Sequence, residues 1–370
     1  MSQENPAPNN LILVAAGGTG GHLFPAEALS HALVARGARV ELATDGRALQ
    51  YGGEFPADAV HEIASATPMG GSIKGKLLAA MTLGKGVYEA YRLLGDIKPR
   101  VIVSFGGYPT VPPALAGSLR GVPLILHEQN AVMGRANKFL SRQAKVIASG
   151  FPGIEGLPEN LREKVVHVGN PLRPQVIEAA ALPYPDFGDG RLRLLVTGGS
   201  QGARIMSDVV PEAVAMLDKA QRARLVIVQQ ARGEDLYRVQ NAYSNLHVEA
   251  DVAPFFADLP LRIAQAHLVI GRSGASTVSE LAAIGRPSIL VPFPHALDAD
   301  QAANAAHLAA TGAAEVIRQM AFTPDWLRER LVHALNDAKD LTRRAQAAKS
   351  AGVPDAAERL ADLVLKTAGL

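Results

Sequence analysis

Short apolar runs of strand length alternate with stretches of helical period along most of the chain. The first run, residues 10–16, leads into a glycine-rich turn and then a helical pattern, which we expect to open at Pro25 and end near Gly37. This alternation predicts parallel, doubly wound α/β sheets. Further strands are expected at 101–104, 123–127, 145–148, 192–197, 224–228, 267–271 and 287–291, and helices at 111–119, 133–143, 235–243 and 275–283.

The unit of strand, glycine turn and helix occurs twice, which predicts two α/β lobes. Its second copy starts at Leu192, at the end of a segment, 170–193, that is rich in proline and glycine. Such a composition is typical of a linker between lobes. The last helix is amphipathic and needs a surface to cover, although periodicity does not identify the lobe. We expect an N-terminal domain over 1–172, a C-terminal domain over 173–352, and a helix over 353–370 that packs back on the first domain.

Composition and charge exclude several classes of protein. The chain has 370 residues, of which 48% are hydrophobic and 19% charged, an ordinary balance for a folded protein of about two domains. Its 37 basic and 35 acidic residues leave a net charge of +2, which argues against a nucleic-acid partner. Without cysteine there are no disulfides, thiolate metal sites or cysteine nucleophiles. The polar N-terminus and the shortness of every apolar run suggest a soluble cytoplasmic protein.

The two glycine turns are candidate phosphate sites. A glycine turn between a strand and a helix lets backbone N–H groups approach an anion at the positive end of the helix dipole. A tight turn with no ligand is the alternative, and the recurrence of the turn counts against it. The dinucleotide pattern fails at both turns, because Leu23 and Ser200 replace required glycines, and neither turn continues as a P-loop. An NAD-dependent oxidoreductase is therefore disfavoured.

Two polar groups follow predicted strands at the sheet edge where α/β proteins bind ligands. On a helix from Ser273, helical spacing would align Ser273, Thr277 and Glu280, and a carboxylate there could accept from both ribose hydroxyls. A capping serine with a solvated glutamate is the alternative. The run 127–130 (His-Glu-Gln-Asn) follows an apolar strand and indicates a site, with turn-forming and capping residues as the alternative.

Six motifs follow one another along nearly the whole chain after the first ten residues. They are 17–22 (GGTGGH), 104–108 (SFGGY), 127–130 (HEQN), 169–171 (GNP), 198–204 (GGSQGAR) and 272–280 (RSGASTVSE). In this order they resemble the MurG family of peptidoglycan glycosyltransferases. The resemblance implies two Rossmann-like lobes of GT-B architecture with the site in the cleft between them, and no cofactor. It also implies inverting transfer of N-acetylglucosamine from UDP-N-acetylglucosamine to lipid I, which forms lipid II.

The resemblance also implies roles for individual residues. His22 would be the catalytic base, or only a ligand of the donor, with Glu128 as the next candidate for the base. Asp298 and Asp300 could clamp a metal or cap a helix, and because the family does not depend on such a metal we assign none. The donor would meet Thr19, Gly20, Gly21, Asn130, Arg173, Ser200, Gln201, Phe256 (beside the uracil), Arg272, Glu280 and Gln301, and the acceptor Tyr108, His127 and Asn137.

A lipid-anchored acceptor implies a peripheral enzyme at the cytoplasmic face of the bacterial plasma membrane. Basic and apolar residues alternate between 70 and 100, and a second basic run spans 133–145. Gly84 and Gly86 are expected to interrupt the helix, leaving a short helix and a loop. Alternatively, Leu77, Met81, Tyr88 and Tyr91 pack into the core beneath a solvated basic face. We expect an anionic membrane surface to contact Ile73, Lys74, Lys76, Leu78 and Lys85.

Three other functions remain as alternatives. A UDP-sugar epimerase of similar architecture would use the same donor pocket, and only the resemblance of the motifs favours the transferase. An NAD-dependent oxidoreductase is opposed by the two failed fingerprints. A two-lobed solute-binding protein is opposed by the lack of a recognisable signal peptide.

Overall fold

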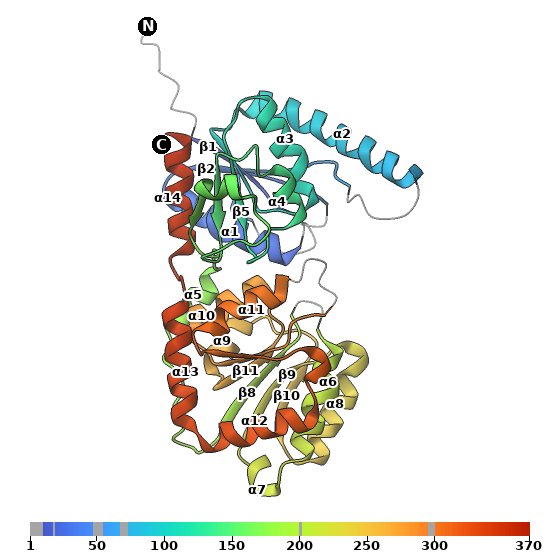
Figure 1. The fold of residues 1–370 in the computed structure, drawn as a ribbon, viewed down its shortest axis with the longest axis vertical. Helices are drawn as coiled ribbons and strands as arrows, with labels where there is room; N and C mark the ends of the chain where they lie inside the picture. The colour runs from blue at the N-terminus through green and yellow to red at the C-terminus, as the bar shows by residue number, and fades with distance from the viewer. Residues whose placement is uncertain (1–9, 18, 47–54, 67–72, 200–201, 295–299) are drawn as a thin grey trace. The chain divides into compact units, whose positions relative to one another are not determined.

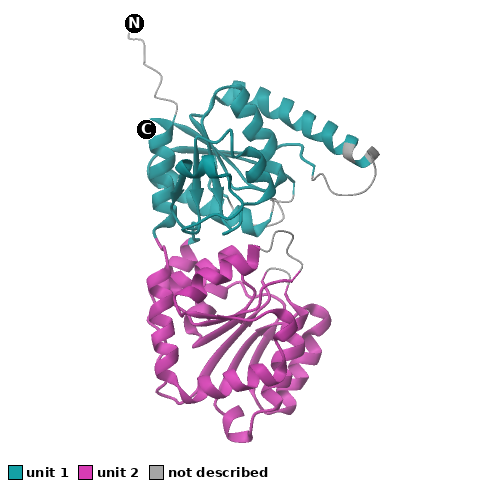
Figure 2. Ribbon diagram, in the orientation of Figure 1, with its two compact units in different colours: residues 1–173, 355–370 teal, residues 174–354 magenta. Residues whose placement is uncertain are grey.

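The computed structural model describes residues 10–17, 19–46, 55–66, 73–199, 202–294 and 300–370 (Figure 1). The chain folds as two units, one made of residues 1–173 and 355–370 and the other of residues 174–354 (Figure 2). This division lies one residue beyond the end of the expected N-terminal domain. The segment expected as a linker contains a helix, α5 (Pro174–Ala180), and that helix is part of the second unit.

Unit 1 is built on a seven-stranded sheet in which every neighbouring pair of strands is parallel, in the order β3-β2-β1-β4-β5-β6-β7. Its strands are β1 (Leu11–Ala15), β2 (Arg39–Thr44), β3 (Ala59–Glu62), β4 (Val101–Ser104), β5 (Leu124–Glu128), β6 (Val146–Ser149) and β7 (Val165–His167). Its helices are α1 (Gly20–Ala35), α2 (Ile73–Ile97), α3 (Val111–Leu119), α4 (Arg135–Leu140) and α14 (Ala356–Ala368).

Both faces of this sheet are buried, which explains why its strands are continuous apolar runs. Ile12 and Val14 of β1 face one core together with residues of α1 and α14, whereas Leu13 and Ala15 face a second core with residues of α2, α3 and α4. The helix α14 buries Leu360 and Val364 in the first of these cores. It therefore packs on the N-terminal unit.

Unit 2 repeats the plan with a six-stranded parallel sheet in the order β10-β9-β8-β11-β12-β13. The two sheets confirm the predicted fold class. The strands are β8 (Leu192–Thr197), β9 (Leu225–Gln230), β10 (Glu249–Ala253), β11 (Leu268–Gly271), β12 (Ser288–Leu290) and β13 (Ala314–Val316). The helices, besides α5, are α6 (Arg204–Ala215), α7 (Lys219–Arg222), α8 (Gly233–Asn245), α9 (Leu259–Gln265), α10 (Ala275–Ile284), α11 (Asp300–Ala310), α12 (Pro324–Asn336) and α13 (Ala338–Ala351).

Two expected helix boundaries are wrong. The helix α1 begins at Gly20 rather than at Pro25, because the Thr19 carbonyl already accepts hydrogen bonds from the amides of His22 and Leu23. Pro25 therefore lies inside the helix. The helix α10 begins at Ala275, as the expected span 275–283 has it, with Gly274 as its N-cap, so the second wrong boundary is the start at Ser273, which precedes the helix.

The expected interruption at Gly84 and Gly86 is also wrong, since α2 is continuous from Ile73 to Ile97. A glycine costs about 1 kcal/mol in a helix, but tertiary packing can offset that cost. At Gly86 the helix approaches the backbone so closely that an added Cβ would lie 1.9 Å from the carbonyl oxygen of Ala64. The missing side chain of Gly86 thus allows α2 to pack closely on the backbone at Ala64, and the helix continues through this position. In the part of the chain that the structure describes, no helix is both long and apolar enough to cross a membrane.

Candidate active site

Apart from Arg173, the predicted site residues of unit 1 lie at the carboxyl ends of β1, β4 and β5 or in the segments that follow them. These strands are neighbours in the sheet and run parallel, so their carboxyl ends lie along one edge. Open α/β sheets bind their ligands at this edge. The sheet topology therefore brings the first, second and third motifs of the sequence to one place in this unit.

His22 lies in the first turn of α1, beside the glycines of two of these loops. Its Nδ1 atom lies 2.8 Å from the Thr19 hydroxyl. A Cβ on Gly17 would lie 3.6 Å from this Nδ1, and a Cβ on Gly107 would lie 3.6 Å from the ring carbon Cε1. Gly107 has φ +79, which favours glycine over other residues. The imidazole is half-buried between two glycine loops and is oriented by the Thr19 hydroxyl.

Glu128, at the end of β5, accepts hydrogen bonds from the loop that follows it. Its Oε2 atom accepts from the Gly134 amide and from Asn137 Nδ2, both at 2.9 Å. Its Oε1 atom accepts from the amide and the side chain of Asn130 at 3.1 and 3.4 Å. The residue is 1% exposed. Burial raises the pKa of the carboxyl, and the hydrogen bonds oppose this by a smaller amount. This arrangement holds the loop from Asn130 to Asn137 against the sheet.

His127 is fully buried and both of its ring nitrogens contact other groups of the protein. Nε2 lies 3.1 Å from the Gly169 carbonyl oxygen and Nδ1 lies 3.0 Å from Gln129 Nε2. Since Nε2 then donates and Nδ1 accepts, the ring is neutral. Burial lowers the pKa of His127 to about 4. The geometry favours a positioning role for His127 and the 2%-exposed Asn137 over direct contact with an acceptor.

The remaining candidates of unit 1 have more varied surroundings. Tyr108 and Asn130 are half-buried at the same edge of the sheet. Gly20 and Gly21 form the first turn of α1, with Gly21 exposed. The guanidinium of Arg173 lies over the ring of Phe24, 4.1 Å from its centroid. These assignments to the donor and the acceptor stay predictions.

In unit 2, the carboxyl end of β8 leads into the second glycine turn. A Cβ on Gly198 would lie 2.1 Å from the backbone nitrogen of Ala203, so only glycine fits where the chain folds back on itself. Gly199 and Gly202 have φ of +81 and +67. Gln230, at the end of the neighbouring β9, accepts from the Gly198 amide at 3.0 Å and so fixes the start of the turn.

Arg272 follows β11, the strand on the other side of β8. Its Nη1 atom donates to the Val291 carbonyl at 3.0 Å, and its Nη2 atom donates to Gln319 Oε1 at 2.7 Å. The residue is 9% exposed, and burial, followed by the charge of Arg232, lowers the pKa of its guanidinium. A cation is thereby placed at the same sheet edge as the glycine turn.

The predicted ribose residue, Glu280, lies on α10 and is 8% exposed. The expected alignment with Ser273 is wrong, because Ser273 lies before the helix and its hydroxyl donates to the Gln301 carbonyl at 2.8 Å. The Gln301 side chain in turn accepts from the Phe293 amide at 2.9 Å. Phe256, predicted beside the uracil, is 8% exposed and packs under the guanidinium of Arg262.

Several predicted residues lie outside the described part of the chain, namely Ser200, Gln201 and Asp298. Asp300 is described and is the first residue of α11. Its Oδ1 atom accepts from the Gln301 amide at 2.9 Å, as expected of an acidic residue at a helix start. Within the described ranges, no group of three or more His, Asp or Glu side chains is arranged to hold a metal.

Sequence reasoning did not identify Gln230 and Gln319, which hold the glycine turn and Arg272. Gln230 could have been noticed, because it is a polar residue at the carboxyl end of an apolar strand. Gln319 had no such signal, since it lies in a short turn far along the chain from Arg272. Its part in the site depends on the tertiary fold alone.

The predicted membrane surface is on α2. Leu77, Leu78 and Met81 are 62%, 65% and 65% exposed, so the alternative in which Leu77 and Met81 pack into the core is wrong. The helix is anchored instead through Ala90 and Leu94, and its N-terminal half extends away from the rest of the unit (Figure 1). Lys85 is exposed and pairs with Glu89 at 3.6 Å. The structure does not describe the side chains of Ile73, Lys74 and Lys76.

Two doubly wound parallel units, each with a glycine turn and polar or cationic side chains at its carboxyl edge, fit the GT-B architecture of nucleotide-sugar glycosyltransferases. Comparison with protein families agrees with this class. Residues 12–149 match the glycosyltransferase family 28 N-terminal domain, and residues 193–360 match the family 28 C-terminal domain.

Comparison with individual relatives shows which glycosyltransferases of family 28 this chain resembles in sequence and structure. The chain is 60% identical over 359 residues to the UDP-N-acetylglucosamine–N-acetylmuramyl-(pentapeptide) pyrophosphoryl-undecaprenol N-acetylglucosamine transferase of Methylobacterium radiotolerans, covering 96% of this chain and 97% of the relative. The crystal structure of Acinetobacter baumannii MurG superimposes with a TM-score of 0.77 at 30% identity, covering 96% and 99% of the two chains. The chain therefore belongs to the MurG family.

The likeness to epimerases is one of fold alone. The UDP-GlcNAc 2-epimerase of Neisseria meningitidis, solved with UDP-GlcNAc bound, gives a TM-score of 0.66 at 14% identity, with 96% and 100% of the chains covered. The shared architecture explains why the glycine turns alone did not separate the two activities.

Proposed function

We propose that this protein transfers N-acetylglucosamine from UDP-N-acetylglucosamine to the muramoyl-pentapeptide of lipid I, forming lipid II for peptidoglycan synthesis. The observation that carries the proposal is the 60% identity, over nearly the full length, to a transferase named for this activity. A UDP-sugar epimerase is not favoured, because its likeness to this chain is limited to the fold.

The geometry of unit 2 supports donor binding. The glycine turn after β8 would bind an anion through backbone amides at the start of α6, as glycine turns between a strand and a helix commonly do. Arg272 supplies a positive charge at the same edge. Glu280 would accept hydrogen bonds from the ribose, and Phe256 would lie beside the uracil. UDP is the leaving group, so these contacts also stabilise charge that develops during transfer.

The geometry of unit 1 supports His22 as the group nearest to the chemistry. In an inverting transfer, the acceptor hydroxyl attacks the anomeric carbon and loses its proton to a base. His22 is half-buried and is oriented by the Thr19 hydroxyl, and an imidazole is a common general base. Glu128 is the other candidate, but its carboxylate already accepts four hydrogen bonds. A positioning role for Glu128 fits these contacts better.

A direct assay tests the proposed reaction. Purified protein is incubated with UDP-N-acetylglucosamine and a short-chain lipid I analogue, and the products are examined by mass spectrometry. We expect one added N-acetylglucosamine on the acceptor together with free UDP. Conversion of the donor sugar without acceptor would contradict the proposal and indicate an epimerase.

We further propose that the protein works at the cytoplasmic face of the plasma membrane as a peripheral protein. The exposed side chains of Leu77, Leu78 and Met81 form an apolar surface, and the lysines of the same helix would add attraction to anionic lipid. Each lysine near such a surface contributes about 1 kcal/mol.

Vesicle co-sedimentation tests this membrane surface. Binding to anionic vesicles should weaken with salt and weaken further when Lys74, Lys76 and Lys85 are changed to Glu. The matched control changes three exposed lysines elsewhere to Glu and so alters the net charge equally. Equal binding by the wild type and the α2 variant at low salt would contradict the assignment. The control lysines are Lys219, Lys339 and Lys366.

A further inference from the structure

Arg232 lies at the same sheet edge as the glycine turn and Arg272. It follows the carboxyl end of β9 and is the N-cap residue of α8. The strand β9 pairs in parallel with β8, and β8 pairs in parallel with β11, so the residues after these three strands are neighbours along one edge. The three strands lead into Arg232, Gly198 and Arg272, respectively.

The side chain of Arg232 lies directly over the glycine turn. Its Nη2 atom donates to the Gly202 carbonyl oxygen at 3.3 Å. A Cβ on Gly202 would lie only 2.9 Å from Cγ of Arg232, so the glycine provides the space that the arginine stem occupies. The turn and the arginine are thus packed together, and the Arg232 side chain as a whole is 39% exposed.

Arg232 forms an exposed ion pair with Glu234. The carboxylate of Glu234 lies 3.8 Å away and is 68% exposed, and pairs of this kind contribute little in water. The charge of Arg232 also lowers the pKa of Arg272, which places two guanidinium groups within electrostatic reach of each other. Two cations so placed repel each other until an anion joins them.

We propose that Arg232 is a further donor-binding residue, which together with Arg272 and the glycine turn binds the diphosphate of the nucleoside-diphosphate sugar. This inference rests on the proposed function and names an additional residue of the same donor site. A planar guanidinium can donate two parallel hydrogen bonds to phosphate oxygens.

The position of this charge bears on the transfer step. The bond between the anomeric carbon and the β-phosphate oxygen breaks, and its electron pair goes to that oxygen. The acceptor oxygen forms the new bond to the anomeric carbon, and its proton passes to the base. UDP therefore gains negative charge as it leaves, and a cation at the diphosphate stabilises the departing group.

The test compares Arg232→Gln with wild type for binding of uridine, UMP and UDP by calorimetry. Uridine carries no phosphate, so its affinity should stay within twofold, whereas UDP affinity should fall about 10- to 100-fold. Arg232→Lys should recover part of the loss, because it keeps the charge but loses the planar fork. The kcat with saturating UDP-N-acetylglucosamine should fall as well.

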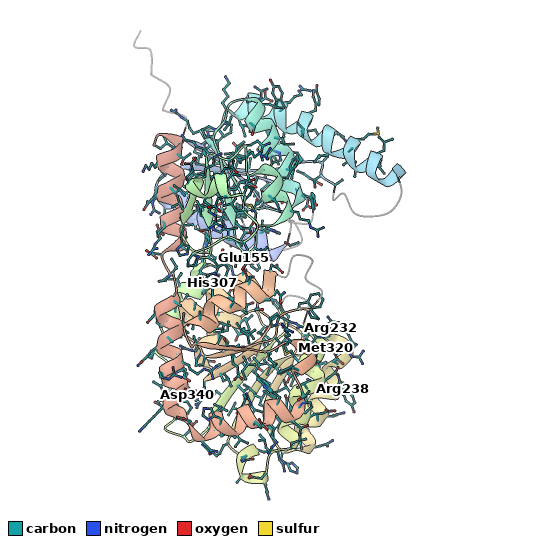
Figure 3. All side chains as sticks on the ribbon, in the orientation of Figure 1. Glu155, Arg232, Arg238, His307, Met320 and Asp340 are labelled. Carbon is teal, nitrogen blue, oxygen red and sulfur yellow. The ribbon has the colours of Figure 1, made fainter. Side chains whose placement is uncertain are left out.

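The matched control is Arg238→Gln on the same helix. Arg238 pairs with Asp208 and Asp235, and Figure 3 shows it further along α8 than Arg232. Its loss should leave UDP affinity unchanged. Equal weakening of uridine and UDP by Arg232→Gln, or no weakening of either, would overturn the inference. If the wild-type protein bound no UDP at all, the proposed function would fail together with the inference about Arg232.

Discussion

Acid should destabilise unit 1 through the buried imidazole of His127. The pKa of this group is about 4 in the folded protein and near 6.5 when it is exposed. Between these values the unfolded chain binds the proton and the folded chain does not, so the free energy of unfolding falls as the pH is lowered from 6.5 to 4. The full difference is about 3 kcal/mol, of which about 2 kcal/mol should be lost between pH 7 and pH 5.

The assay is urea unfolding at both pH values, followed by hydrogen exchange of peptides that cover β5. Tryptophan fluorescence would report the wrong unit, because the sole tryptophan of the sequence, Trp326, lies on α12. His127→Gln is the matched variant, since an amide can still donate to the Gly169 carbonyl but does not titrate. Parallel pH profiles for the wild type and this variant would refute the assignment of acid sensitivity to His127.

Three further predictions concern the donor site, the base and the core of unit 2. Glu280→Ala should lower kcat/KM about 10- to 100-fold with an unchanged circular dichroism spectrum, and wild-type UDP affinity and kcat/KM would show the ribose assignment to be wrong. His22→Ala should lower kcat by roughly 10²- to 10⁴-fold while UDP binding is kept, whereas loss of donor affinity alone would indicate a donor ligand. Arg286→Met should lower the free energy of unfolding of unit 2 by about 1 to 3 kcal/mol, because it removes the hydrogen bonds to the carbonyls of Ala264, Ile284, Gly285 and Pro183. Trp326 fluorescence measures this change, and unaltered unfolding would contradict it.

The strands were predictable because parallel strands buried on both faces are continuous apolar runs. Residues 101–104 and 192–197, for example, coincide with β4 and β8. The helix starts were less predictable. Pro25 is typical of the first turn of a helix, but the Thr19 carbonyl already accepts the first helical hydrogen bonds of α1. Local composition also failed at Gly86, where a contact with the distant backbone of Ala64 decides the structure.

The candidate site was predictable to the extent that its residues follow strands. The motifs placed His22, Glu128 and Arg272 at the carboxyl edges of the two sheets, because each of these residues lies at or after the end of a parallel strand. Which atoms those side chains contact depends on segments remote in sequence. Gln319, for instance, reaches Arg272 only through the fold of unit 2. For this reason the sequence did not distinguish a catalytic Glu128 from one whose oxygens already accept hydrogen bonds from its own loop.

The polar groups at the carboxyl edges of the two sheets differ in their electrostatic surroundings. In unit 1, His127, Glu128 and Asn137 are at most 2% exposed and are hydrogen-bonded largely to one another and to the backbone, so this cluster is set before any ligand arrives. In unit 2, Arg232 and Arg272 repel each other across a turn that itself favours anions. An anionic ligand relieves that repulsion, and more negative charge on the ligand relieves it further. Unit 2 is therefore suited to bind a diphosphate more tightly as it becomes the leaving group, which is the form of binding that accelerates a reaction.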